Sequence, residues 1–230
     1  MVSHGDKTPR REFIGSLATG AATLGMAAIA PLGLHAKASS ALAAGDADAW
    51  LDKVKSKKHR VVFDVTKPHD VMPFAWPFVY LNTHEATGSP ASDCGVVVIL
   101  RHDAIGYAFK DEIWAKYKLG EMFHAPDPVK QMQAADRNPF WQPKTGDFKV
   151  PGLGNADIGI NQLMDRGVMF GVCDVAMTVY SAVVAGENGD AAAVKKDWVA
   201  GLLPNIMIMP SGVWAVGRAQ EKGCSYIFAS

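Results

Sequence analysis

The sequence has no excess of charge of either sign. Its 23 basic and 23 acidic side chains give a formal net charge of zero over 230 residues. A chain without net charge has no general electrostatic attraction to the phosphates of nucleic acid or to an anionic membrane surface. We therefore exclude both as leading binding partners and expect no nucleic-acid partner.

Cysteine is also scarce, with three residues at Cys94, Cys173 and Cys224. An odd number leaves at least one thiol unpaired within the chain, whatever the compartment. Cys94 and Cys224 each begin an apolar run, so they are expected to be buried small hydrophobic residues or a disulfide pair. Cys173 is the cysteine with chemically informative surroundings.

Short catalytic and metal-binding motifs are absent. The sequence contains no CxxC or HExxH spacing, no GxSxG nucleophile elbow and no evident internal repeat. A hydrolase is therefore disfavoured, and we predict no bound cofactor and no metal. Two weaker metal hypotheses stay open: His124 and Asp127 as ligands together with Cys173 and His102, and the pair Met207 and Met209 as a copper site, for which core packing is the better explanation.

The amino-terminal segment resembles a twin-arginine (Tat) export signal. Residues 8–14 read TPRREFI and precede a weakly hydrophobic stretch rich in Ala and Gly, and residues 36–38 supply a small-residue cleavage site. We predict a signal peptide at residues 1–38, a periplasmic protein and no stable membrane span after cleavage. The alternative is an uncleaved anchor over residues 13–34, although its glycines and Pro31 make a poor spanning helix.

The rest of the chain alternates between strand and helix patterns. A leader and an amphipathic helix are predicted at 39–58, followed by a domain at 59–230. Apolar runs at 60–65, 95–100, 168–172, 206–209 and 226–229 predict strands, and residues 73–86, 111–117, 160–166, 174–184, 190–203 and 213–222 predict helices. This order predicts an α/β three-layer sandwich with a mostly parallel sheet of about five strands.

One stretch, residues 119–158, does not follow that pattern. It is rich in proline and glycine and shows little periodicity. It is too long for an ordinary connection, so we interpret it as a loop insert that serves as a lid, a binding loop or an oligomer contact.

Cys173 falls where a predicted buried strand ends and a helix begins. In parallel α/β sheets this edge is where ligands bind, and the first turn of a helix favours negative charge. A thiol there can ionise below its free pKa of about 8.5. Asp174, which can serve as the N-cap or as a first-turn carboxylate, opposes that effect.

Other candidate site residues follow strands that end at the same edge. Arg101, His102 and Asp103 come directly after the strand at 95–100. Of these, His102 is the candidate catalytic neighbour of the thiol, as a cation or general base, or else a strand-capping histidine. Ser211 and the amide of Gly212 are candidate ligand-binding groups, although a serine in such a turn often bonds the backbone.

Several of these features together resemble the DsrE/DsrF-like family with its YchN-like fold. The resemblance rests on the strand and cysteine, the Pro-Ser-Gly-Val turn and the final helix and strand, namely Gly167–Cys173, Pro210–Val213, Gln220, Lys222, Gly223, Tyr226 and Ile227. The sequence matches the family pattern well from about residue 166 onward and only loosely at the strands that begin near Arg60 and Gly95. The resemblance implies a three-layer sandwich that forms homotrimers or homohexamers.

In that family the cysteine that aligns with Cys173 passes sulfur between proteins as a persulfide. The resemblance therefore implies a thiol-based sulfur carrier or sulfur-redox protein whose partner is a sulfur donor or acceptor protein or a small sulfur compound. Two alternatives remain: an exported oligomeric module that binds a small ligand or metal without thiol chemistry, and a structural oligomer with no active thiol.

Overall fold

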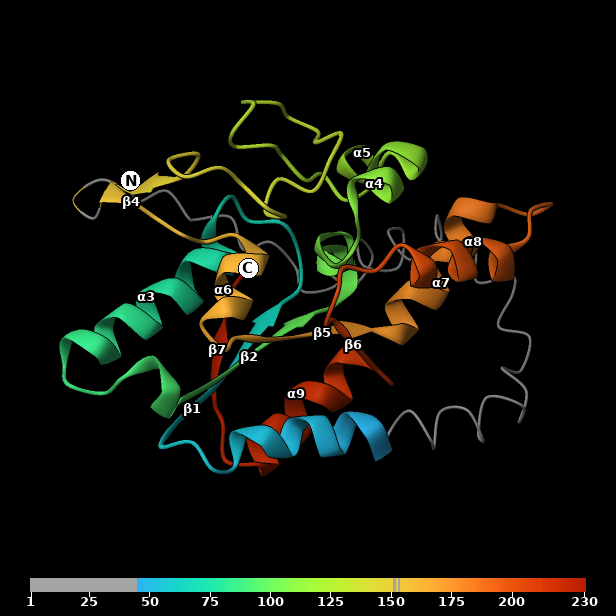
Figure 1. The fold of residues 1–230 in the computed structure, drawn as a ribbon. Helices are drawn as coiled ribbons and strands as arrows, with labels where there is room; N and C mark the ends of the chain where they lie inside the picture. The colour runs from blue at the N-terminus through green and yellow to red at the C-terminus, as the bar shows by residue number, and fades with distance from the viewer. Residues whose placement is uncertain (1–44, 151, 153) are drawn as a thin grey trace, which may run out of the picture. The chain divides into compact units, whose positions relative to one another are not determined.

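The computed structural model describes residues 45–150, 152 and 154–230 (Figure 1). Five parallel strands form its main sheet in the order β6-β5-β2-β1-β7. Their bounds are β1 His59–Val65, β2 Cys94–Leu100, β5 Met169–Cys173, β6 Met207–Met209 and β7 Ser225–Phe228. The predicted signal peptide at 1–38 lies outside the described residues.

Helices cover both faces of this sheet, which confirms the predicted α/β sandwich (Figure 1). Alternate residues of β1 face opposite ways: Val61 and Phe63 enter the larger core, and Val62 enters the smaller one. The larger core is shared by α3 (Met72–Ala86), α6 (Ile160–Asp165), α7 (Asp174–Ala185) and α8 (Ala191–Ala200). On the other face lie the N-terminal helix (residues 45–51), η1 (Asp52–Val54) and α9 (Gly212–Glu221).

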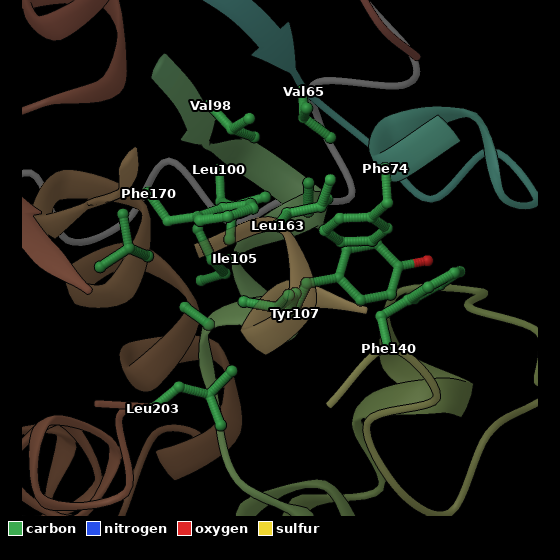
Figure 2. Close-up of a cluster of buried hydrophobic side chains, with 14 of the residues drawn as sticks. Val65, Phe74, Val98, Leu100, Ile105, Tyr107, Phe140, Leu163, Phe170 and Leu203 are labelled. Atoms are coloured by element: carbon green, nitrogen blue, oxygen red, sulfur yellow. The ribbon is translucent and has the colours of Figure 1, made fainter. Parts of the chain in front are cut away.

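Aromatic rings fill the centre of the larger core (Figure 2). The ring of Phe74 packs on Phe140 with centroids 4.3 Å apart and meets the ring of Tyr107 edge-on at 5.2 Å. The Tyr107 hydroxyl is buried without a hydrogen-bond partner in the described structure, and burial raises the pKa of Tyr107. Phe74 comes from α3 and Phe140 from the predicted insert, so the insert forms part of the core.

The insert at 119–158 contains α5 (Leu119–Met122) and a small antiparallel pair, β3 (Lys149–Val150) and β4 (Gly154–Asn155). Asn138 fixes it to the domain, because its side-chain amide donates 2.9 Å hydrogen bonds to the carbonyls of Tyr107 and Phe109. Those carbonyls belong to the end of η3 (His102–Ala108) and the residue after it. The remaining short elements are η2 (Ala91–Asp93) and α4 (Asp111–Tyr117).

The helix predicted at 73–86 is α3, which begins at Met72 and has Pro73 at the tolerated first-turn position, with Pro77 inside the helix. One predicted helix boundary was wrong. The helix predicted to reach Leu203 ends at Ala200, because the amide of Leu203 instead donates to the carbonyl of Ala108 at 2.8 Å.

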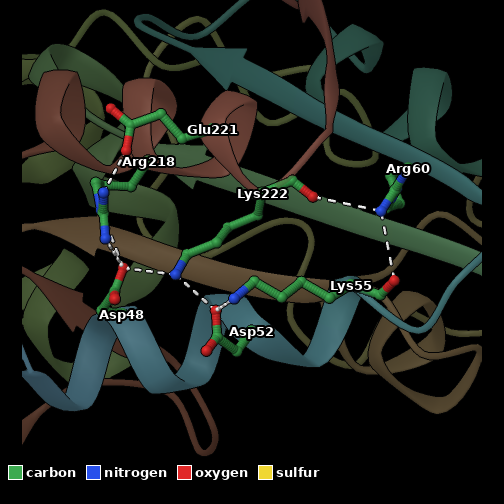
Figure 3. Close-up of polar contacts among 7 residues, drawn as sticks. All are labelled: Asp48, Asp52, Lys55, Arg60, Arg218, Glu221 and Lys222. Atoms are coloured by element: carbon green, nitrogen blue, oxygen red, sulfur yellow. Dashed lines mark hydrogen bonds and ion pairs between the residues drawn. The ribbon is translucent and has the colours of Figure 1, made fainter.

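Ion pairs attach the N-terminal helix to α9 (Figure 3). The Lys222 ammonium lies 2.6 Å from Asp52 and 3.0 Å from Asp48, and Arg218 reaches Asp48 at 2.7 Å. Lys222 is the main cause of the lowered pKa of both Asp48 and Asp52. Apolar contacts of Ala47, Leu51 and others lie beneath these pairs.

Candidate functional site at the carboxyl edge of the sheet

The connections after β5 and β6 leave the sheet on opposite faces. The chain after β5 enters α7 on the face of the larger core, whereas the chain after β6 enters α9 on the other face. Such a divergence between adjacent parallel strands creates the crevice in which α/β proteins bind ligands. Cys173 ends β5 and pairs with Met209, the last residue of β6, so the predicted cysteine lies at this point.

Cys173 is the N-cap of α7. Its sulfur accepts a hydrogen bond from the amide of Ala176 at 3.3 Å, and this bond satisfies one of the free donors at the helix start. The residue is only 6% exposed, so the thiol is largely covered by its neighbours. The sulfur therefore lies at the helix start, where the amide of Ala176 points at it.

Asp174 is the first residue of α7 rather than its N-cap. Lys195 of α8 places its ammonium 2.8 Å from the Asp174 carboxylate and donates to the Thr178 hydroxyl at 2.8 Å. This ion pair places a positive charge against the carboxylate next to Cys173. Asp174 therefore has a structural partner, and its predicted ligand-binding role stays a prediction.

Ser211 and Gly212 form the start of α9. The Ser211 hydroxyl accepts a hydrogen bond from the amide of Trp214 at 3.1 Å, so it caps the helix as many serines do. Gly212 is buried, and its predicted role as an anion-binding amide stays a prediction. The structure thus brings the starts of α7 and α9 to the ends of paired strands.

His102 contacts other groups than the thiol. Its Nδ1 lies 2.9 Å from Asp103 and 3.3 Å from the Tyr180 hydroxyl, and its side chain is 65% exposed. The Tyr180 hydroxyl also donates to Asp103, and burial with this bond raises the pKa of Tyr180. His102 has no hydrogen bond to Cys173 in the described structure, so its catalytic role stays a prediction.

Arg101 is a cationic residue close to Cys173, a role that the sequence pattern did not indicate. The register pairs Leu100 with Val172, so Arg101 and Cys173 each follow directly from one of these paired residues, and the stem of Arg101 packs against Gly212, three residues after the Met209 that pairs with Cys173. Arg101 donates from Nε and Nη2 to the two carboxylate oxygens of Asp64, at 2.6 and 2.8 Å. The Tyr226 hydroxyl donates to the same carboxylate at 3.0 Å.

These contacts shift the pKa values of Arg101 and Tyr226. The hydrogen bonds from Arg101 to Asp64 raise the pKa of the Arg101 guanidinium, with smaller effects from charge on Tyr226 and Cys173. Burial and then the bond to Asp64 raise the pKa of Tyr226. A signal was present in the sequence: Asp64 interrupts an apolar strand, and a buried carboxylate requires a partner such as Arg101.

The two weaker metal hypotheses gain no support. Asp127 is fully buried and uses its carboxylate to accept from Arg137 and from the amides of Val129 and Lys130. No group of three or more His, Cys, Asp or Glu suited to a metal occurs among residues 45–150, 152 and 154–230. Met209 is buried in the smaller core.

Cys94 and Cys224 are unpaired and buried, so the disulfide alternative is wrong for this structure. Burial raises the pKa of Cys94, and it raises that of Cys224 to about 11. Both thiols are therefore held in their neutral form near neutral pH.

A scan against family models and searches of curated proteins and of solved structures found no match to this chain. Within the described part of the chain, no helix is both long enough and apolar enough to cross a membrane.

Proposed function

We propose that this protein is a DsrE-like, thiol-based sulfur carrier or sulfur-redox protein that acts through Cys173. The observation that carries the proposal is the position of the thiol. Cys173 lies where the connections of two paired strands diverge, caps a helix with its sulfur and has Arg101 beside it. The other two cysteines lack such surroundings, and burial disfavours their thiolates.

The proposed chemistry is exchange of a sulfane sulfur, which is the zero-valent outer sulfur of a persulfide. The Cys173 thiolate attacks the terminal sulfur of a donor persulfide, the donor S–S bond breaks, and the donor leaves as a thiolate with the electron pair. A Cys173 persulfide results, and no oxidant is consumed. An acceptor thiolate then removes the same sulfur by the reverse type of step.

Because Cys173 is buried, sulfur transfer requires that the thiol become accessible. A thiol that is 6% exposed meets a donor sulfur only when its neighbours move or when a partner displaces them. The shielding would protect a persulfide from solvent oxidants between transfers. We therefore assign the delivery and removal of sulfur to docked partners or to small sulfur compounds.

We further propose export by the Tat pathway, a periplasmic location and assembly as a homotrimer or homohexamer. The export proposal depends on the amino-terminal pattern. Two exposed apolar features support assembly: Val175, Val179 and Val183 form a stripe along α7, and β7 exposes Ile227 and Phe228.

A second candidate function, small-ligand binding without thiol chemistry, is favoured by a cavity of about 440 Å³. It lies at the opposite edge of the sheet, and its size is suited to a small molecule. Its lining comprises Trp50, Lys53, Met164, Gly167, Val168, Met169, Asn205, Ile206 and Met207. Fluorescence titration with amphiphilic carboxylates, compared with a Lys53→Gln variant, would test this function.

Persulfide loading tests the first function. The full chain is incubated with inorganic polysulfide, the persulfides are blocked with an alkylating agent, and the cysteine peptides are analysed by mass spectrometry. We expect an added sulfur atom on Cys173 and much less on Cys94 and Cys224, which act as internal controls. Equal loading of the three, or loading that spares Cys173, would contradict the proposal.

A further inference from the structure

We propose that Arg101 determines the substrate specificity of the Cys173 site, and that it selects small anionic sulfur compounds over neutral ones of the same size. This inference rests on the proposed thiol function and adds the class of substrate. It differs from the sequence prediction, in which His102 was the cationic neighbour.

Arg101 retains hydrogen-bonding capacity after it has bonded Asp64. A guanidinium has five N–H donors, and Asp64 uses one on Nε and one on Nη2. Among the described residues, Nη1 of Arg101 has no acceptor. These donors are free to bind an oxyanion, which guanidinium groups recognise in bidentate geometry.

The pair is oriented with its positive end outward. The side chain of Asp64 is 3% exposed, whereas that of Arg101 is 27% exposed. A ligand that approaches from solvent therefore meets the guanidinium before the carboxylate. Because Coulomb energy falls with distance, the nearer charge dominates even though the pair is neutral as a whole.

Arg101 is held in place from two sides. Asp64, itself bonded by Tyr226, fixes the guanidinium, and the Arg101 Cβ lies 2.4 Å from where a side chain on Gly212 would begin. The stem of Arg101 therefore occupies the space that the glycine leaves open. A group fixed in this way loses little conformational entropy when it binds a ligand. Asp64 and Tyr226 act as positioning residues.

The other charged groups near this edge are already paired. Asp174 is bonded by Lys195, and Asp103 accepts from Tyr180 and lies beside His102. The free donors of Arg101 are therefore the feature that discriminates by charge. Thiosulfate represents the class of substrate that they favour.

The reaction with thiosulfate balances without a further reagent. The Cys173 thiolate attacks the outer sulfur, the S–S bond of thiosulfate breaks, and sulfite leaves with the electron pair. The products are the Cys173 persulfide and sulfite, with the total charge unchanged. Arg101 would bind the sulfonate oxygens of the donor and of the departing sulfite.

Iodoacetate and iodoacetamide test the inference, because the two reagents alkylate thiols by the same displacement of iodide and differ mainly in charge. The ratio of their rates at Cys173 is measured in the full chain by mass spectrometry. We expect Arg101→Gln to lower the iodoacetate-to-iodoacetamide ratio by about three- to tenfold at low salt. Arg101→Lys should retain part of the preference.

Two further variants control for charge and folding. Arg166 lies just before the amino end of β5, far along the strand from Cys173, and pairs with Glu85. Arg166→Gln removes a positive charge there and should leave the ratio unchanged. The double variant Asp64→Asn/Arg101→Gln leaves no buried carboxylate unpaired and keeps the net charge constant. It should show the same lowered ratio as Arg101→Gln.

The outcomes separate this inference from the function on which it rests. If Cys173 reacts with both reagents and the ratio is the same in wild type and in both Arg101 variants, charge selection by Arg101 is wrong and the thiol function stands. If Cys173 reacts with neither reagent, the proposed function fails and the inference fails with it.

Discussion

Gly212 and Arg101 approach so closely that no side chain fits between them. A Cβ built on Gly212 would lie 2.4 Å from the Cβ of Arg101 and 2.8 Å from its Cδ. We expect Gly212→Ala to displace either Arg101 or the start of α9 and to destabilise the protein by about 1 to 3 kcal/mol. Urea unfolding followed by circular dichroism measures this change.

Gly217, in the same helix, is the matched control. No atom lies within 4 Å of a Cβ built there, and the residue is exposed. Gly217→Ala should stabilise the protein by up to about 1 kcal/mol, because alanine restricts the unfolded chain and favours helix. Equal effects of the two substitutions would contradict the close approach at Gly212.

The ion pair of Asp64 and Arg101 predicts that Asp64→Asn destabilises the protein more than Tyr226→Phe does. Asp64→Asn leaves a largely covered guanidinium without its counter-ion, so we expect a loss of about 2 to 3 kcal/mol in the free energy of unfolding. Tyr226→Phe removes one hydrogen bond to Asp64 at a more exposed position, so the loss should be under about 1 kcal/mol. A larger loss in Tyr226→Phe than in Asp64→Asn would refute this ranking.

Much of the fold could be predicted from periodicity. β2 is apolar throughout because a central parallel strand is buried on both faces, and β1 carries a run of apolar residues broken at Asp64; both strands were located to within one residue. The order of strands in the sheet could not be predicted, because it depends on which crossovers pack together. The core position of Phe140 was also missed, since an isolated aromatic residue in a loop has no periodic signal.

The ion pairs between the N-terminal helix and α9 predict sensitivity to acid. The pKa values of Asp48 and Asp52 are lowered in the folded protein, chiefly by Lys222. The stabilisation they give is therefore present above the ordinary carboxyl pKa of 3.8 and is lost as pH falls through the lower, folded-state values. Hydrogen exchange of residues 45–51, followed by mass spectrometry and divided by the intrinsic exchange rate at each pH, should show protection factors that fall as the pH is lowered.

Lys222→Gln should lower the protection of residues 45–51 near neutral pH. It should also make that protection depend less on pH. Lys55→Gln is the control, because Lys55 also pairs with Asp52, at 2.8 Å, but lies at an exposed position where an ion pair contributes little. Protection of residues 45–51 that is identical in wild type and in Lys222→Gln would show that apolar packing alone holds the helix.

Cys224 predicts a loss of stability in alkali. Burial raises its pKa from 9.0 to about 11, so the folded protein holds a proton that the unfolded chain releases. The stabilisation is complete below pH 9.0 and is lost as pH rises through about 11, with a slope of at most about 1.4 kcal/mol per pH unit. Urea unfolding at pH 8 to 11 should show this slope, and Cys224→Ala should reduce it.

Tyr80 serves as a control for the loss of stability at alkaline pH. Its pKa is raised to about 12, chiefly by burial, so it contributes to alkaline unfolding at higher pH than Cys224. A Tyr80→Phe variant should therefore keep the slope that begins near pH 9. If Cys224→Ala had the same slope as wild type, ionisation of this thiol would not be the cause.

The candidate site was only partly predictable. Cys173 could be placed at the carboxyl edge because a strand pattern changes to a helix pattern at that residue. Its burial and its Arg101 neighbour could not, because they depend on the register of β2 against β5. Histidine was preferred as the neighbour because its ordinary pKa is close to neutral, whereas the pairing of Arg101 with Asp64 connects residues 37 positions apart.

The central claim is that Cys173 is the reactive thiol of this protein, and competitive alkylation measures it most directly. The folded full chain is treated at pH 7 with a limiting amount of isotope-labelled iodoacetamide, then unfolded and treated with the unlabelled reagent, so that each cysteine reports its own rate. We predict that Cys173 reacts at least about tenfold faster than Cys94 and Cys224, because its sulfur lies at a helix start and accepts the amide of Ala176, whereas burial raises the pKa of the other two thiols. A rate at Cys173 equal to or below the rates of those two cysteines would contradict the claim.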